Sequence, residues 1–217
     1  MEPARQPQHA KIQLVETANE TTLYLDGGQA MQAWEAELMR DSADLLCRYG
    51  TNFLEAGLGL GLSALHIAGK PSTAQHQVVE KYAEVIKLFE ERYQPLPPSL
   101  KIIHGDIFDV VPQLDPESLD GIFFDPFLPD AVNNDVSLWQ WFVPELVRCL
   151  RIGGVLIPCF TSKPSLRWQF EPYFDRVLIE RRRFEAYSNT NYMANHKGSV
   201  YIQCFERCGR TAIGALF

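Results

Sequence analysis

The sequence predicts an α/β fold with a seven-stranded, mainly parallel sheet and an antiparallel hairpin at one edge. Short apolar runs alternate with stretches of helical periodicity along the chain, which is the pattern of consecutive βαβ units. A glycine-rich turn joins one apolar run to the helix that follows it, and the last two apolar runs are separated only by a polar loop. The length of 217 residues accommodates one such domain.

The N-terminal part differs from the rest in composition. Residues 1–19 are polar and contain proline, so we expect a flexible N-terminal segment or mobile flap there, with the folded domain over residues 20–217. Apolar residues at helical spacing from Met31 to Leu46 predict an amphipathic helix. Thr51–Ala56 then predicts a strand that leads through the glycine turn into a helix at Ser63–Ala68.

The remaining elements continue the alternation as far as the hairpin. Further strands are predicted at His76–Glu80, Lys101–His104, Gly121–Phe124 and Val155–Phe160, with the hairpin strands at Arg176–Glu180 and Ser199–Phe205. Further helices are predicted at Tyr82–Phe89, Trp139–Leu150 and Ser165–Phe174, and a turn at Arg151–Gly154. Helices that connect parallel strands cover both faces of a sheet, so we expect a three-layered domain.

Composition and charge limit the function classes. The chain has 20 Lys+Arg against 27 Asp+Glu, a formal net charge of -7, which disfavours binding to nucleic-acid phosphates and suits a small or cationic substrate. No apolar run is long enough to span a bilayer, and the N-terminus has no apolar signal core. Five cysteines without Cys-x-x-Cys spacing are typical of reduced thiols and give no metal site. We therefore expect a cytoplasmic monomer or homodimer with a small-molecule substrate and no nucleic-acid, membrane or metal partner.

The glycine turn reads Glu55-Ala-Gly57-Leu-Gly59-Leu-Gly61 and follows the first central strand. In open α/β sheets, ligands bind beyond the carboxyl ends of the strands, so a cofactor should approach these glycines. A carboxylate two residues before the first glycine would repel a pyrophosphate but can bind an ammonium group. The pattern therefore disfavours NAD.

Two further acids stand at the ends of neighbouring strands. Glu80 ends the second strand and lies at the expected distance from the glycines to accept two ribose hydroxyls. Asp106, after the third strand, offers a carboxylate for an adenine amino group, and Ile107 offers an apolar side chain for the ring. These positions predict a nucleoside site at this edge of the sheet.

Together with the segment 151–154, these residues resemble the class I S-adenosylmethionine-dependent methyltransferases from about Asn52 to Phe160. The resemblance implies a single Rossmann-like domain that binds S-adenosylmethionine without a metal. It places Glu55 near the methionine end of the cofactor and Glu80 at the ribose. The residues expected to bind the cofactor are Tyr24, Glu55, Gly57, Gly59, Gly61, Glu80, Lys81, Asp106, Ile107 and Asp125.

Two other segments, Met31-x-x-Trp34-Glu35-x-x-Leu38-Met39 and Phe124-Asp125-Pro126-Phe127, look like the guanidinoacetate and arginine N-methyltransferase group. In that group, the Glu after Trp and the Asp after the fourth strand hold a guanidinium, and the matching residues are Glu35 and Asp125. Two carboxylates facing a guanidinium form charge-assisted hydrogen bonds and favour removal of its proton. The resemblance implies N-methyl transfer to a small guanidino or amine compound, with Glu35 and Asp125 as catalytic residues.

Three other functions stay open, because Asp125 is followed here by Pro126, where the group usually has Thr. In a cyclase of the same fold, the cofactor's own α-amine displaces methylthioadenosine and forms azetidine-2-carboxylate. Asn134 is then a third catalytic candidate, as an oxygen contact for the amine. The segment Tyr24-Leu-Asp26-Gly27 also looks like the spermidine synthases, which transfer an aminopropyl group. The last alternative is a non-catalytic module that binds the nucleoside.

Overall fold

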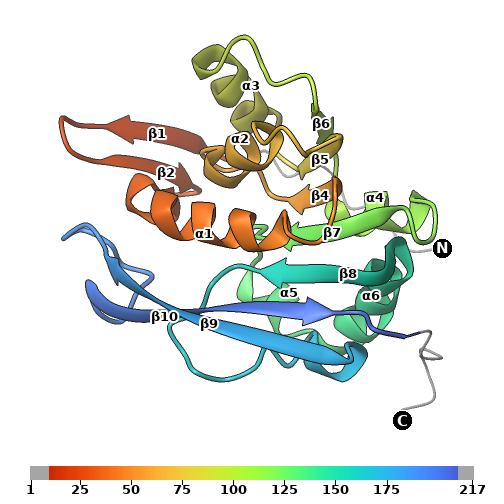
Figure 1. The fold of residues 1–217 in the computed structure, drawn as a ribbon. Coiled ribbons are helices and arrows are strands. Elements are labelled where there is room, and N and C mark those ends of the chain that lie inside the picture. The colour runs from red at the N-terminus through yellow and green to blue at the C-terminus, as the bar shows by residue number, and fades with distance from the viewer. Residues whose placement is uncertain (1–9, 210–217) are drawn as a thin grey trace.

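The computed structural model describes residues 10–209, which contain the predicted seven-stranded sheet. Its strands are β4 (Asn52–Ala56), β5 (Gln75–Glu80), β6 (Leu100–His104), β7 (Leu119–Phe124), β8 (Leu150–Pro158), β9 (Arg176–Glu185) and β10 (Lys197–Glu206). They are ordered β6-β5-β4-β7-β8-β10-β9. The first five are parallel, and β10 is antiparallel to both β8 and β9, so the predicted fold class is confirmed. Figure 1 shows β9 and β10 as a long hairpin at one edge.

Helices cover both faces of this sheet. Successive residues of a strand point to opposite faces, so Phe53 and Phe123 pack with α1, α2 and α3, whereas Leu54 and Ile122 pack with α4 and α6. The helical segments are η1 (Ala33–Glu35), α1 (Ala36–Leu46), α2 (Leu62–Ala68), α3 (Ala83–Arg92), α4 (Ile107–Val110), η2 (Val111–Gln113), α5 (Asp130–Asn133), α6 (Val136–Cys149) and η3 (Glu171–Tyr173). Within residues 10–209, no helix is both long and apolar enough to cross a membrane.

An additional antiparallel sheet precedes α1 and was not predicted. It contains β1 (Ile12–Glu16), β2 (Thr21–Leu25) and β3 (Gly28–Gln32) in that order, and Figure 1 shows β1 and β2 standing apart from the large sheet. The turn between β2 and β3 is the pair Asp26-Gly27, both with positive φ, which is the type I′ hairpin signal. That signal was present in the sequence.

This small sheet changes two boundaries. β1 lies within residues 1–19, where we expected no fixed structure, because Ile12 and Leu14 pack against the core and the strand pairs with β2; residues 1–9 lie outside the described residues. The helix expected from Met31 begins only at Ala36. Met31 has helical spacing, but it lies in β3, where it pairs with Leu23 of β2 and is buried.

Two predictions around β8 were also wrong. The segment Arg151–Gly154 is part of β8 instead of a turn, and the strand ends at Pro158. The helix expected at Ser165–Phe174 is reduced to η3. The Gln203 side chain on β10 accepts a hydrogen bond from Arg167 N and donates one to Ser165 O, so these main-chain groups pair with a strand residue in place of a helical turn.

Candidate cofactor and acceptor site

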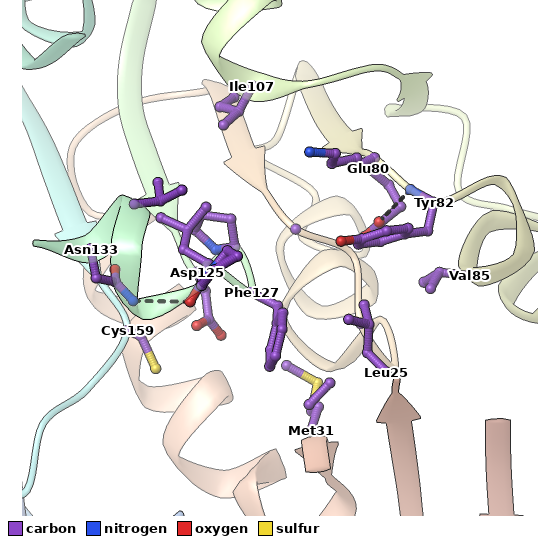
Figure 2. Close-up of a pocket in the computed structure, with 18 of the residues that line it drawn as sticks. Leu25, Met31, Glu80, Tyr82, Val85, Ile107, Asp125, Phe127, Asn133 and Cys159 are labelled. Carbon is purple, nitrogen blue, oxygen red and sulfur yellow. Dashed lines mark hydrogen bonds between the residues drawn. The ribbon is translucent and has the colours of Figure 1, made fainter. Parts of the chain in front are cut away.

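A cavity of about 930 Å³ lies at the carboxyl ends of the five parallel strands. Its walls come from the glycine turn, the loops after β5 to β8 and the N-terminal sheet. Figure 2 shows Asp125 and Cys159 on one side of it and Glu80 and Tyr82 on the other. Both the position at this edge and the volume are typical of small-molecule sites in α/β proteins.

The glycine turn forms one wall of the cavity through Gly57 and Gly59. Gly57 has a φ of 89°, and a Cβ there would lie 2.6 Å from the carbonyl oxygen of Asp125. Glycine is required because the ends of β4 and β7 approach each other at this point. The third glycine, Gly61, does not line the cavity; a Cβ on it would meet the Phe89 ring, so its role is helix packing.

Glu80 holds this turn in place from the end of β5. Its Oε2 accepts a hydrogen bond from Leu58 N at 2.9 Å, and its Oε1 accepts one from Tyr82 N at 2.8 Å. Burial raises the pKa of Glu80, and these main-chain donors counteract the rise. The main-chain amides of Lys81 and Gly59 also lower this pKa, and Glu80 lines the cavity, so it presents a carboxylate to a ligand bound there.

Asp106 and Lys81 form an ion pair on the same wall. Lys81 Nζ lies 3.0 Å from Asp106 Oδ2, and Asp106 Oδ1 caps α4 by accepting a hydrogen bond from Phe108 N. Ile107 lies beside them with its apolar side chain against the cavity. The residues predicted for the adenine side, Asp106 and Ile107, therefore lie together, and the charge of the Asp106 carboxylate is balanced by Lys81.

Glu55, in contrast, lies beneath the turn and is not among the cavity-lining residues. It is 1% exposed, accepts a hydrogen bond from the Ser63 hydroxyl, and has His76 Nε2 3.0 Å from its Oε2. These contacts tie β4 to α2 and β5. Glu55 is therefore a core residue, whereas the sequence resemblance placed it in contact with the cofactor.

Two further predicted residues lie outside the cavity. Leu23 and Leu25 of β2 line the cavity. Since successive side chains of a strand point to opposite faces, Tyr24 between them faces away from the cavity. Asn134 follows the last residue of α5 and is exposed, and its side chain donates a hydrogen bond to Asp130 O. Its neighbour Asn133 lines the cavity instead, so this prediction missed the lining position by one residue.

Glu35 is a buried carboxylate that also lines the cavity. It is 4% exposed, and its Oε1 accepts hydrogen bonds from the Tyr192 hydroxyl at 2.6 Å and from Gln32 N at 2.8 Å. Burial raises the pKa of Glu35 to about 7 against the lowering effect of both donors, and the charge of Asp125 raises it further. Glu35 is thus poised to gain or lose a proton near neutral pH.

Asp125 is the second carboxylate of this region and follows β7. Burial raises its pKa to about 7; the negative Glu55 adds to the rise, whereas the Cys159 thiol and the positive Arg167 lower it. Asp125 and Glu35 both line the cavity, as the guanidinium hypothesis requires. Among the described residues, no group of three or more His, Cys, Asp or Glu side chains is arranged to hold a metal ion.

Three important neighbours of these carboxylates were missed. The sequence patterns predicted no catalytic or cofactor-binding role for Tyr192, Cys159 or Arg167. All three lie far from Glu35 and Asp125 in the sequence and meet them only because β8 and the β9–β10 loop end at the same edge. No local pattern marks such a contact.

The Tyr192 contact yields a direct test. In Tyr192→Phe the stacking on Trp34 (ring centroids 6.2 Å apart) can persist, but a donor that favours charged Glu35 is lost. We expect the pKa of Glu35 to rise above its value of about 7, measured by ¹³C NMR titration of the labelled carboxyl group. Tyr187→Phe, in the same loop, should leave it unchanged; equal titration in both variants would contradict the role of the hydroxyl.

Comparison with known proteins agrees with this geometry. Residues 5–170 match the family model described as guanidinoacetate N-methyltransferase. The chain belongs to this family. It is therefore a member of the class I S-adenosylmethionine-dependent methyltransferase superfamily, as the sequence resemblance indicated, and membership implies S-adenosylmethionine as the cofactor.

Individual relatives of this family member are distant. Protein arginine N-methyltransferase 2 of Yarrowia lipolytica is 27% identical over 143 residues, which cover 63% of this chain and 29% of the relative. The protein of the same name from Aspergillus fumigatus is 31% identical over 112 residues, covering 50% of this chain and 26% of the relative. The chain thus spans less than a third of these relatives.

Solved structures share the fold of this family member. The spermidine synthase of Thermotoga maritima has a TM-score of 0.67 at 15% identity, covering 92% of this chain and 70% of that one. A probable spermidine synthase of Corynebacterium glutamicum has a TM-score of 0.64 at 18% identity, covering 91% and 77%. At these identities the likeness concerns the fold alone.

Proposed function

We propose that this protein transfers a methyl group from S-adenosylmethionine to a nitrogen atom of a small guanidino or amine compound. The observation that carries the proposal is the pair of carboxylates, Glu35 and Asp125, in the same cavity as the glycine turn. A cationic acceptor between them would form charge-assisted hydrogen bonds with both. The family match and the excess of acidic residues support the same substrate class.

The cofactor fits the part of the cavity that the glycine turn, Glu80 and Asp106 line. Gly57 and Gly59 let the main chain approach it, and Glu80 lines the same part of the cavity with a carboxylate that can accept hydrogen bonds from ribose hydroxyls. Asp106 and Ile107 offer a carboxylate and an apolar surface for adenine. When bound, S-adenosylmethionine supplies a methyl group activated by its sulfonium.

The chain's own part in the reaction is to orient the acceptor and accept a proton. Glu35, held by Tyr192 and the Gln32 amide, fixes the direction of the acceptor nitrogen, and such orientation is a large part of catalysis in direct transfer. As the nitrogen gains a methyl group it loses a proton, and a carboxylate oxygen of Asp125 or Glu35 accepts it. Groups with pKa values of about 7 suit this task at neutral pH.

The deciding experiment incubates the protein with S-adenosylmethionine, with and without guanidinoacetate, arginine, agmatine or simple amines. We expect S-adenosylhomocysteine and an N-methylated product only when an acceptor is present. Methylthioadenosine with azetidine-2-carboxylate, formed from the cofactor alone, would overturn the proposal in favour of cyclisation. Aminopropyl transfer from the decarboxylated cofactor, or binding without any turnover, would support the other two alternatives.

Cofactor binding has its own test in Glu80→Gln. The substitution removes the negative charge that would bind the ribose hydroxyls, and hydrogen bonds to charged groups contribute about 1.5–3 kcal/mol. We expect the affinity for S-adenosylhomocysteine, measured by calorimetry, to fall roughly 10- to 100-fold. The control is Glu84→Gln, an exposed acid in the first turn of α3; equal affinities in the two variants would contradict the ribose contact.

A further inference from the structure

Arg167 is a positive charge in the cavity that forms no ion pair with a carboxylate of residues 10–209, although its charge reaches Asp125 from further away. Of the described residues that line the cavity, two are cationic, Lys81 and Arg167. Lys81 is paired with Asp106, whereas within residues 10–209 no carboxylate oxygen lies within 4.0 Å of Arg167. Its Nη2 instead donates to the main-chain carbonyls of Cys159 at 3.0 Å and Phe160 at 3.4 Å. These bonds fix the guanidinium in position but leave its charge unbalanced at close range.

The guanidinium also carries an unused donor. Arg167 Nε is buried and has no hydrogen-bond partner among the described residues. Arg167 lines both the main cavity and a smaller adjoining one of about 70 Å³, which Asp125 and Asn133 also line. An unpaired buried N–H of a charged group is costly, so a ligand oxygen that pairs with it would bind favourably.

We propose that Arg167 binds a carboxylate group of a ligand in this cavity. The guanidinium presents several N–H donors in a planar fork, which matches the geometry of a carboxylate. This inference rests on the proposed function, because that reaction offers two sources of a carboxylate. One is the methionyl part of the cofactor, and the other is an acceptor that is itself a guanidino acid or an amino acid. Arg167 is then a specificity-determining residue, opposite in charge to Glu35 and Asp125.

The test uses two ligand pairs that differ in the carboxylate-bearing part. S-adenosylhomocysteine is compared with 5′-methylthioadenosine, and guanidinoacetate is compared with methylguanidine in the presence of saturating S-adenosylhomocysteine. Calorimetry gives each affinity for the original protein, Arg167→Gln, Arg167→Lys and the control Lys163→Gln, an exposed residue of the same segment.

We expect Arg167→Gln to weaken the carboxylate-bearing member of one pair about 10- to 100-fold and its partner less than about twofold. A loss confined to S-adenosylhomocysteine would assign the methionyl carboxylate, and a loss confined to guanidinoacetate would assign the acceptor. Arg167→Lys should retain part of the affinity, since it keeps the charge but loses the fork.

Other outcomes would overturn the inference. If Arg167→Gln weakens both members of each pair equally, or neither, Arg167 does not bind a ligand carboxylate. If the original protein binds all four ligands and Arg167→Gln gives either of these results, only the inference about Arg167 fails. If the original protein binds none of them, the proposed function fails as well.

Discussion

Asp125→Asn is expected to lower kcat/KM for methyl transfer by about 10²- to 10⁴-fold, the range typical of a lost general base. Asparagine keeps the shape of the side chain but can neither carry the charge that holds a cationic acceptor nor take its proton. The affinity for S-adenosylhomocysteine should stay within a few-fold, because Glu80, the residue expected to bind the ribose, lies on the other side of the cavity from Asp125 (Figure 2). Steady-state kinetics and calorimetry on the same preparations separate the two effects.

The matched control is Asp130→Asn, which removes an exposed acid from the same loop at the start of α5. It should retain full activity. In the original protein, kcat/KM should rise with pH through about 7 as Asp125 and Glu35 lose their protons. Full activity of Asp125→Asn, or an equal loss in Asp130→Asn, would refute the role of Asp125.

The same carboxylates should make the protein without ligand less stable as the pH rises. The pKa of Asp125 is raised on folding from 3.8 to about 7, so between these values the native state binds more protons than the unfolded state. The stabilisation is fully present below pH 3.8 and is lost as the pH rises through about 7. Asp125→Asn should therefore lose less in melting temperature between pH 5 and 8 than the original protein; equal losses would contradict the raised pKa.

Gly57→Ala is expected to cause a large loss of stability. Alanine at a φ of 89° is strained by about 1–2 kcal/mol, and its Cβ would lie 2.6 Å from the carbonyl oxygen of Asp125. Relief of that contact needs the ends of β4 and β7 to separate, at a further cost of about 1–3 kcal/mol. Thermal unfolding measures the sum.

Gly27→Ala isolates the contact from the backbone strain. Gly27 has a φ of 82°, but a Cβ there would meet no atom of residues 10–209 within 4 Å. For a chain of this size, a difference of about 1–3 kcal/mol corresponds to a melting temperature roughly 2–12 °C lower for Gly57→Ala than for Gly27→Ala. Equal melting temperatures would show that the β4 and β7 ends move apart without cost.

Much of the fold was predictable because its cause is local. The order of apolar runs and helical periods specified the parallel strands, since each βαβ unit must bury one face of its helix on the sheet. The glycine turn and Glu80 could be placed for the same reason: strand ends and tight turns leave a signal within a few residues. The Asp26-Gly27 hairpin left one too, and it was overlooked in favour of the helical spacing of Met31.

The site was less predictable because side-chain direction depends on partners elsewhere in the chain. Glu80 is the last residue of β5 and Glu55 the last but one of β4. Ser63 and His76 nevertheless hold Glu55 in the core, while Glu80 faces the cavity. Asn133 and Asn134 are adjacent, and only the first lines the cavity. Whether such a side chain faces the cavity depends on the local direction of the backbone, which residue spacing does not specify.

The sequence by itself determined the fold class, the edge of the sheet where the cavity lies, and the acids available there. The tertiary structure alone decided which acids reach the cavity, and it alone brought Tyr192, Cys159 and Arg167 to Glu35 and Asp125. The physical reason is that periodicity and turn chemistry act over a few residues, whereas burial and charge act through space. The proton affinities of Glu35 and Asp125 are properties of the assembled site.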